Sequence, residues 1–423
     1  MSPPARRLAA AAAVIVLCTG VIGAGLLRPG PAASPPDIAT LDASPERGAY
    51  LATASNCRTC HTTNDGQPFA GGVRFQTPFG VLYSTNVTMD EATGIGRWSF
   101  EDFYASMKHG VRPDGTQLYP AFPYPSFAKL TDADIASLYL YMKTVEPVNA
   151  PARENELDFP YNLRSGLRAW NRLFHDPGAF VADPARSPEW NRGAYLVQGP
   201  VHCGACHSPR NFLGAEREEL ALTGGTFIDR VSEGKYRQWS AVNLTSAKRG
   251  LAAWSLDEIV AYLKDGESAR AVVHGPMTEV VMNSTRHLED ADVHAIATYL
   301  KELPALDASS GKNADHEQLA AGEVAYTVHC GTCHLPTGLG DEVMGVTLAG
   351  NAIVQANDPA SLINVVLYGP HLPPPPFVSD RTRMKPFGKR LSDEDIANLT
   401  TYLRASFGND AGVVTAAQVK RQR

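Results

Sequence analysis

The sequence has little cysteine and no surplus of positive charge, and both absences narrow the class of protein. Seven cysteines in 423 residues are too few for a disulfide-rich scaffold. The formal net charge is −6, so we expect no cationic surface for nucleic acid. Hydrophobic residues make up 44% and charged residues 19%, a balance that excludes disorder throughout the chain. A chain of this length exceeds one compact core, and we expect two to four domains.

Long apolar runs are also scarce, and only one reaches spanning length. It extends without charge from Leu8 to Leu27, directly after Arg6 and Arg7. A basic start followed by an apolar stretch is the layout of an export signal, and this stretch is also long enough to cross a bilayer. We therefore predict that residues 1–34 form an export signal or a membrane anchor, with the basic end cytoplasmic.

Six of the seven cysteines fall in three copies of the pattern C-x-x-C-H, which is typical of c-type haem attachment. The spacer lets one helical turn present both sulfurs to the porphyrin vinyl groups, and the histidine supplies the proximal nitrogen to iron. A thioredoxin-like pair gives no reason for the histidine, and a zinc site would need a second ligand pair beside each copy. The sequence therefore predicts three covalent haems c. Their attachment residues are Cys57, Cys60 and His61, then Cys203, Cys206 and His207, then Cys330, Cys333 and His334.

The motifs belong to a longer repeat, which predicts the fold. A short helical run with a glycine precedes each motif, and this glycine suits two helices that cross closely, because a side chain would hold them apart. Each repeat ends in a second helix, expected over Asp132–Lys143, Asp290–Lys301 and Asp393–Arg404. Few stretches alternate as strands do. We therefore predict an all-α fold of three tandem class I cytochrome c domains behind the N-terminal signal or anchor helix.

The repeat also predicts the domain boundaries. The three cytochrome c domains are expected over residues 42–147, 188–304 and 315–408, followed by a tail over 409–423. Between the first two domains, residues 151–186 form a helical linker that carries apolar residues and three arginines at helical spacing. Two readings of this linker remain open. It is either a helix packed on its own domains, or a docking surface for a partner subunit or the membrane.

The sixth iron ligand decides the chemistry of each haem, since a methionine sulfur raises the reduction potential and an open site admits small ligands. In domain 2 the predicted distal ligand is Met277, which precedes the terminal helix, with Met282 as its competitor. In domain 3 it is Met384, with Met344 as a weaker candidate.

Domain 1 is the exception, because the equivalent loop, residues 118–125, contains no methionine. Met107 aligns with a core position, and His109 is a candidate nitrogen ligand for which a structural role is favoured. We leave the distal ligand of haem 1 unassigned. This haem is predicted to be five-coordinate or ligated by a non-equivalent residue.

Taken together, these motifs resemble the three-haem cytochrome c subunit of bacterial membrane-associated dehydrogenases for alcohols, gluconate and related sugar acids or polyols, and some aldehydes. The resemblance covers the chain from about Asp42 to Gly408. Besides the haem motifs it rests on the runs Pro68–Gly72, Tyr83–Thr88, Thr93–Gly96 and Asn162–Phe174, the Tyr119-Pro120 loop, and Met277 and Met384 in their loops.

The resemblance implies an electron-transfer subunit that performs no substrate chemistry itself. Such a subunit takes electrons from a catalytic subunit with a quinone, flavin or molybdenum cofactor, and passes them to membrane ubiquinone or another respiratory acceptor. It implies a place on the periplasmic side of the cytoplasmic membrane of a Gram-negative bacterium, N-terminally anchored or peripherally bound. The family usually has a methionine where this chain has Phe122, so haem 1 departs from the family.

Two other functions fit the residues. One is a free or tethered multihaem carrier that serves a terminal oxidase or reductase. The other is a haem enzyme or sensor that uses an open site at haem 1. A stable complex with a larger subunit distinguishes the relay from the free carrier, and carbon monoxide binding to the ferrous protein identifies an open site.

Overall fold

The computed structural model describes residues 34–232, 235–307, 314–341, 343–370, 372 and 383–423. The predicted signal or anchor therefore lies outside the described residues, except for Ser34. Among the described helices, none combines the length and the apolar character needed to cross a bilayer.

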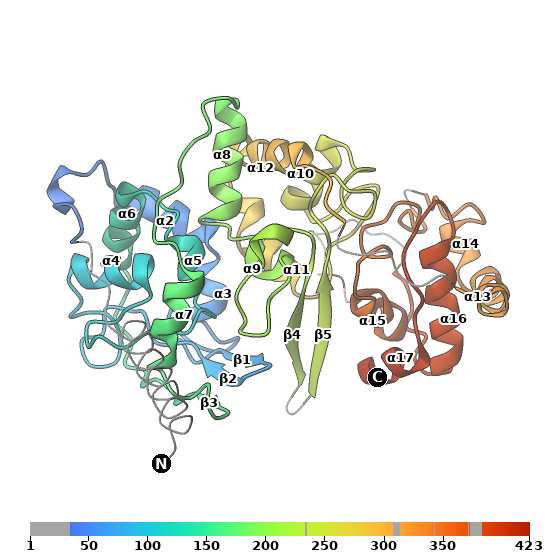
Figure 1. Cartoon of the computed structure of the whole chain (residues 1–423), viewed down its shortest axis with the longest axis horizontal. Coiled ribbons are helices and arrows are strands. Elements are labelled where there is room, and N and C mark those ends of the chain that lie inside the picture. Colours follow the sequence, from blue (N-terminus) through green and yellow to red (C-terminus); the bar gives the residue numbers. More distant parts are fainter. Residues whose placement is uncertain (1–33, 233–234, 308–313, 342, 371, 373–382) are drawn as a thin grey trace, which may run out of the picture.

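The helices gather into three groups that follow one another along the longest axis of the molecule (Figure 1). The first unit contains η1 (Ile38–Thr40), α2 (Pro45–Ala54), α3 (Cys57–His61), β1 (Arg74–Thr77), β2 (Gly80–Tyr83), α4 (Phe100–His109), α5 (Tyr124–Phe127), α6 (Asp132–Met142), β3 (Glu156–Leu157) and α7 (Gly166–Phe174). The second contains α8 (Pro188–Gln198), α9 (Gly204–His207), η2 (Glu218–Leu220), β4 (Gly225–Ser232), β5 (Lys235–Ala241), α10 (Leu256–Asp265), α11 (Met277–Asn283), η3 (Thr285–His287) and α12 (Asp290–Glu302). The third contains α13 (His316–His329), α14 (Gly331–His334), α15 (Ala360–Tyr368), α16 (Asp393–Ala405) and α17 (Ala416–Gln422).

Each unit has its own hydrophobic core, which explains why three groups form. Leu51 and Ile135 lie in the first core, Leu196 and Ile296 in the second, and Tyr326 and Ile396 in the third. In every unit these pairs come from the helix before the motif and from the terminal helix. The cores therefore form where the amphipathic faces of these two helices meet.

The two helices cross at a glycine in all three units, as the sequence predicts. A Cβ atom on Gly48 would overlap the carbonyl oxygen of Ser137 in α6, and one on Gly193 would overlap that of Ala295 in α12. A Cβ atom on Gly322 in α13 would likewise overlap the carbonyl oxygen of Asn398 in α16. Only a residue without a side chain lets the backbones approach this closely.

Serine caps start three of the helices. Ser99, Ser255 and Ser392 each form a complete capping box at the start of α4, α10 and α16. Each box satisfies two backbone groups that would otherwise lack a partner at a helix start. The terminal helices α6, α12 and α16 begin at the predicted residues and end within one residue of them.

The molecule is mostly helical, but the all-α prediction is wrong in one respect, because the fold includes two small antiparallel sheets. Strands β1, β2 and β3 form one sheet, and β4 and β5 form a long hairpin. Tertiary contacts hold this hairpin between the other two units. Arg74 of β1 stacks on the Tyr236 ring at 4.9 Å, and Ser240 exchanges hydrogen bonds with Ser361 of α15. Strand preference depends strongly on packing against neighbouring residues. The residues that pack against β4 and β5 are distant in the sequence, which explains why the sequence did not predict this hairpin.

Reciprocal contacts of the same kind join the first and second units. Asp134 pairs with Arg47 of its own unit and accepts a hydrogen bond from Tyr195 of the second unit. Asp292 pairs with Arg192 of its own unit at 2.6 Å and accepts a hydrogen bond from Tyr50 of the first unit at 2.5 Å. The two units therefore meet through equivalent residues, as in a two-fold symmetric dimer.

The predicted linker helix is α7, and it packs on the first unit, as one of the two readings expects. Asn171 accepts a hydrogen bond from Tyr124, and His175 Nε2 donates to the carbonyl of Lys108 at 2.7 Å. On its other side, Trp170 Nε1 donates to the carbonyl of Leu213 in the second unit at 3.0 Å. The helix therefore bridges two units.

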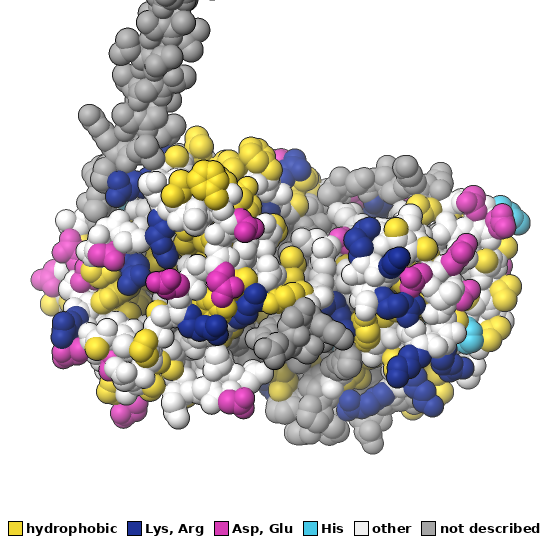
Figure 2. All heavy atoms as spheres, turned by 90° about the horizontal axis from the view of Figure 1, so that it is seen from below, with side chains coloured by type: hydrophobic (Ala, Val, Ile, Leu, Met, Phe, Trp, Pro, Cys, Tyr) yellow, Lys and Arg dark blue, Asp and Glu magenta, His cyan; other side chains and the backbone are white. Residues whose placement is uncertain are grey.

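An apolar surface remains exposed beside α7. Phe79 lies at its centre, with its ring 4.6 Å from that of Tyr161 and also against Gly214. Tyr161 is 40% exposed and Phe212 is 84% exposed. Figure 2 shows hydrophobic side chains gathered on this end of the molecule. We call Phe79, Tyr161, Trp170, Phe212 and Leu213 the apolar surface.

Replacement of the glycine at a helix crossing is expected to destabilise the fold. Gly193→Ala would force α8 and α12 apart and lower the free energy of unfolding by about 1–3 kcal/mol. Gly166→Ala is the matched control, because nothing lies near a Cβ at that helical position. There alanine should be neutral or stabilise by up to about 1 kcal/mol. Urea unfolding followed by far-ultraviolet circular dichroism measures both, and equal effects would contradict the close crossing.

Candidate functional site

Each C-x-x-C-H motif folds as a single helical turn. In the first unit this turn is α3, and Asn56 precedes it in a left-handed conformation that separates it from α2. In the second and third units the turns are α9 and α14, which the first cysteine of each motif precedes. All six cysteines are free thiols, so no disulfide closes any motif. Each turn therefore presents two thiols and an imidazole from one short segment.

The three motif histidines are held in the same way. Nδ1 of His61 lies 2.8 Å from the carbonyl oxygen of Thr85, and Nδ1 of His207 lies 2.8 Å from that of Val242. Nδ1 of His334 lies 2.9 Å from the carbonyl oxygen of Val346. A carbonyl oxygen only accepts hydrogen bonds, so Nδ1 carries the proton and Nε2 keeps its lone pair. This is the usual way in which proteins orient a metal-ligating histidine.

Burial sets the protonation state of these groups. Desolvation lowers the pKa of His61, His207 and His334, which favours the neutral imidazole that binds metals. Desolvation also raises the pKa of Cys57 and Cys203 to about 12, so both thiols are protonated. A thiolate-based redox pair requires the opposite shift, which argues against that alternative.

The residues around the motifs fit a haem c. The donor set of two thiols and one oriented imidazole matches covalent attachment and proximal iron ligation. In the second unit, Trp239 Nε1 is buried without any hydrogen-bond partner among the described residues. Its ring lies beside His274, in the loop that leads to Met277. A carboxylate on the haem edge is an acceptor of the kind that this donor lacks.

The predicted distal methionine of the second unit lies at the start of α11. Met277 is half-buried and packs against the second core and against Val273 and Val281. Its competitor Met282 is engaged elsewhere, because its sulfur accepts a hydrogen bond from Arg286 at 3.4 Å. The packing therefore favours Met277.

The third unit distinguishes its two candidate methionines by packing. Met384 is half-buried against the third core, in the loop that returns along the end of α15. Met344 lies two residues before Val346, whose carbonyl holds Nδ1 of His334. Met344 is not among the residues packed on the third core, whereas Met384 is, which favours Met384 as the distal residue.

The first unit has an aromatic ring in the loop that would carry a methionine. Phe122 is half-buried on the first core, with its ring 5.3 Å from that of Phe127. Met107 is buried in the core, as predicted. Nε2 of His109 is buried without a partner among the described residues, and desolvation lowers the pKa of this histidine.

Family models match two parts of the chain. Residues 45–146 match the cytochrome c family, and residues 317–403 match the family described as cytochrome c oxidase, cbb3-type, subunit III. The cytochrome c subunit of the quinone-type alcohol dehydrogenase of Gluconacetobacter polyoxogenes is 40% identical over 393 residues, which cover 89% of this chain and 84% of that protein. The gluconate 2-dehydrogenase cytochrome c subunit of Pantoea cypripedii is 39% identical and covers 90% of both chains. The fructose dehydrogenase cytochrome subunit of Gluconobacter japonicus is 37% identical, over 89% of this chain and 82% of that protein.

The chain belongs to the family of dehydrogenase cytochrome c subunits. This confirms the resemblance that the motifs indicate. Members of the family are the electron-transfer subunits of their complexes, and catalysis lies in another subunit. The prediction that the chain is not itself the catalytic subunit is therefore confirmed.

Several functional features of this cytochrome c subunit have no signal in the sequence. The acceptors for the three histidines are backbone carbonyls, and any residue type can supply one. Likewise, the second unit touches the first motif through Asn283 Nδ2, which donates to Thr59 Oγ1 at 2.8 Å. His202, which precedes Cys203, packs its ring on Phe127 of the first unit at 5.6 Å. The first two motifs thus lie at one interface, which spacing along the chain does not reveal.

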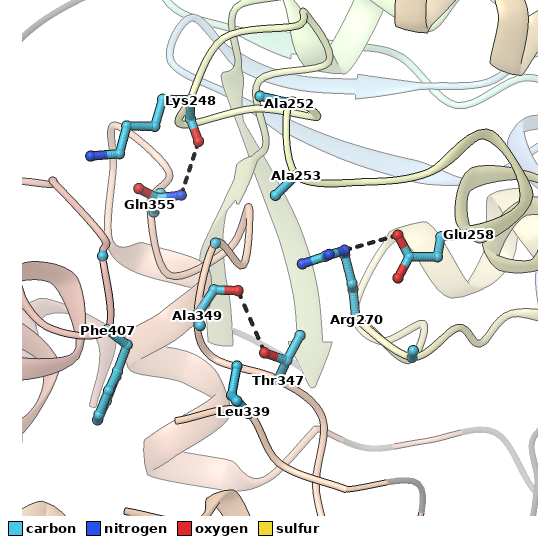
Figure 3. Close-up of a pocket in the computed structure, with 13 residues that line it drawn as sticks. Lys248, Ala252, Ala253, Glu258, Arg270, Leu339, Thr347, Ala349, Gln355 and Phe407 are labelled. Carbon is cyan, nitrogen blue, oxygen red and sulfur yellow. Dashed lines mark hydrogen bonds and ion pairs between the residues drawn. The ribbon is translucent and has the colours of Figure 1, made fainter. Parts of the chain in front are cut away.

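A cavity of about 510 Å³ lies between the second and third units (Figure 3). Arg270 on its wall pairs with Glu258 at 2.9 Å, and Gln355 Nε2 donates to the carbonyl of Lys248 at 3.1 Å. None of the motif cysteines or histidines lines this cavity. The motifs, rather than this cavity, define the functional sites.

Substitution of Gly71 is expected to disturb the site of the first unit. Its N–H donates to the carbonyl of His61 at 2.7 Å, and a Cβ there would overlap the backbone of Thr85. Gly115 is the matched control, because its φ is +77° against +76° for Gly71 and nothing lies near it. Gly115→Ala should cost about 1 kcal/mol of backbone strain.

Gly71→Ala should cost about 1–3 kcal/mol more than the control, because the Thr85 carbonyl must move away from His61. Urea unfolding measures the free energies, and the ratio of covalent haem to protein reports on the site. Equal losses in the two variants would show that the contact with Thr85 has no role.

Proposed function

We propose that the chain carries three covalent haems c and relays electrons from a periplasmic dehydrogenase catalytic subunit to membrane ubiquinone or another respiratory acceptor. The observation that carries the proposal is the threefold repetition of one arrangement, a C-x-x-C-H turn whose histidine is oriented by a backbone carbonyl. The relatives are named as subunits of alcohol, gluconate and fructose dehydrogenases, so the partner belongs to the same broad class. A quinone, flavin or molybdenum cofactor in that partner is the electron source.

Different residues attach each proposed haem and bind its iron. Cys57 and Cys60, Cys203 and Cys206, and Cys330 and Cys333 attach it, and His61, His207 and His334 bind the iron from the proximal side. Met277 and Met384 bind from the distal side in the second and third units. A bound haem supplies a one-electron iron couple, and burial together with axial ligation sets its potential. Each unit, by this proposal, is one cytochrome c domain.

The interface between the first and second units suits a relay. Asn283 of the second unit donates a hydrogen bond to Thr59 of the first motif, and His202, which precedes Cys203, packs on Phe127 of the first unit. The paired aspartates Asp134 and Asp292 fix the relative orientation of the units. A rigid contact between two redox sites keeps the separation between them constant, which a relay needs.

The apolar surface is the face that we assign to the catalytic subunit. Lasting subunit interfaces are more apolar than ordinary surface. Arg210 donates hydrogen bonds to the carbonyl of Ala205 in the second motif and to that of Gly214, so the segment with Phe212 and Leu213 lies beside this motif. The uncharged run in residues 1–34 supports export and a place at the periplasmic side of the cytoplasmic membrane, anchored or peripheral.

Affinity purification from detergent-solubilised membranes tests the relay. We expect a larger subunit to co-purify, and we expect alcohols, aldehydes or sugar acids to reduce the bound haems. Phe212→Ser should lower the recovery of that subunit, whereas Arg97→Glu on an exposed loop should not. A lone cytochrome that none of these substrates reduces would instead indicate a free carrier.

Carbon monoxide titration tests the distal ligands. Met277→Leu and Met384→Leu should each add about one binding site per ferrous chain, because a ligand site opens when the sulfur is lost. Met282→Leu and Met344→Leu are the matched controls and should add none. Unchanged stoichiometry in the first two variants would refute the assignment.

The same titration examines the first unit. Carbon monoxide binding to the unmodified protein at about one site per chain would indicate an open haem 1. Phe122→Met should then abolish that site. Carbon monoxide binding at haem 1 would also favour the alternative function, a haem enzyme or sensor that uses an open site at haem 1.

A further inference from the structure

Positive charge concentrates at the C-terminal end of an otherwise acidic chain. The net charge is −6, yet residues 383–423 carry eight basic and four acidic side chains. Lys385, Lys389, Arg390, Lys420 and Arg421 are all exposed. Figure 2 shows lysine and arginine side chains gathered on the part of the molecule where α17 lies. We call these five residues the basic face.

Contacts within the third unit bring the two segments of the basic face together. The guanidinium of Arg423 donates to the carbonyl oxygens of Gly388 and Leu391, and it pairs with Asp393 at 2.7 Å. The hydroxyl of Tyr368 donates to the carbonyl of Gln422 at 2.7 Å. The C-terminal end is therefore fixed beside the loop 384–390, and the basic face is a fixed feature of the surface.

A further arginine extends this face from the second unit. The Arg237 guanidinium of β5 stacks on the Tyr368 ring, with its carbon 3.7 Å from the ring centroid. The hairpin thus contributes positive charge to the same area. Charge from two units and three chain segments converges there.

The basic face borders the third motif. Phe387 is buried in the third core, and its ring lies 5.8 Å from that of His329, the residue before Cys330. The guanidinium carbon of Arg390 lies 5.7 Å from the centroid of the Phe387 ring. The predicted distal residue Met384 is the neighbour of Lys385. The basic face therefore lies along the loop that carries the predicted distal residue of the third unit.

We propose that the basic face is the docking site of an acidic one-electron redox protein that accepts electrons from the third unit. The proposal rests on the proposed function and names the acceptor by its chemistry. One electron leaves the ferrous site of the third unit and reduces the oxidised centre of the partner, and no proton is transferred. A positive rim speeds the encounter with an acidic partner and gives a contact that dissociates readily.

The composition of the face favours this partner over the others. A lasting subunit interface is apolar, and peripheral helices that lie in a lipid surface use aromatic or aliphatic side chains beside their basic ones. Among the described residues, every large hydrophobic side chain with high exposure lies outside 383–423. The apolar surface beside α7 has the opposite character. The chain thus presents one face suited to a permanent partner and one suited to a transient partner.

Stopped-flow oxidation of the reduced full-length protein tests the proposal, with plastocyanin as an acidic copper-protein oxidant. Lys385→Glu/Lys389→Glu should slow this reaction about ten-fold at low salt, and added salt should remove the difference. Arg97→Glu/Lys143→Glu is the matched control, because it makes the same charge change on the first unit and should leave the rate unchanged. Oxidation by neutral benzoquinone should be equal in all three proteins, which shows that the haems remain competent.

Two results would overturn the docking site. Equal slowing by both double variants would show that only net charge matters. Loss of binding to phosphatidylglycerol vesicles in Lys385→Glu/Lys389→Glu, with an unchanged plastocyanin rate, would assign the face to lipid. Absence of covalent haem or of benzoquinone oxidation would instead refute the proposed function itself.

Discussion

The close crossing of two helices at a glycine is the constraint on which the rest of the structure depends. In each unit the first helix can reach the terminal helix only because Gly48, Gly193 or Gly322 has no side chain. The motif follows directly after that first helix, so the crossing decides where the cysteines and the histidine stand. The cores then form on both sides of the contact, since apolar area is buried where the two helices meet. A side chain at the crossing would therefore disturb the fold and the site together.

In all three sites a backbone carbonyl, rather than a charged side chain, orients the histidine. The carbonyls of Thr85, Val242 and Val346 fix the tautomer of the histidines, and burial keeps the imidazoles neutral. No charged side chain is required for this, which suits sites that gain and lose an electron in a low-dielectric environment. By our proposal the sites differ mainly on the distal side, where two units have a methionine and the first has Phe122. The proposed difference falls at the position that most affects reduction potential and ligand access.

The contacts between neighbouring units are of two kinds. The first and second units meet through buried aspartates that each bind an arginine and a tyrosine, which makes a specific and rigid joint. The third unit meets the second through the β4–β5 hairpin, where Ser240, Ser361 and Asn364 form hydrogen bonds. The outer surface is divided as well, with apolar side chains beside α7 and positive charge around the loop of Met384. These two unlike surfaces fit the proposed relay between a lasting partner and a transient one.

The sequence by itself determined the parts of this protein that depend on local chemistry. The spacing in C-x-x-C-H predicts the haem attachment residues, the helical periodicity located α6, α12 and α16, and the glycines indicated the close crossings. It did not reveal β4 and β5, because strand formation there depends on contacts with Arg74 and α15 that are distant along the chain. Only the tertiary structure decided which carbonyls hold the histidines, which aspartate meets which tyrosine, and which basic residues share a face. These are relations between distant segments, and side-chain identity in one segment carries no information about the backbone that comes to lie against it.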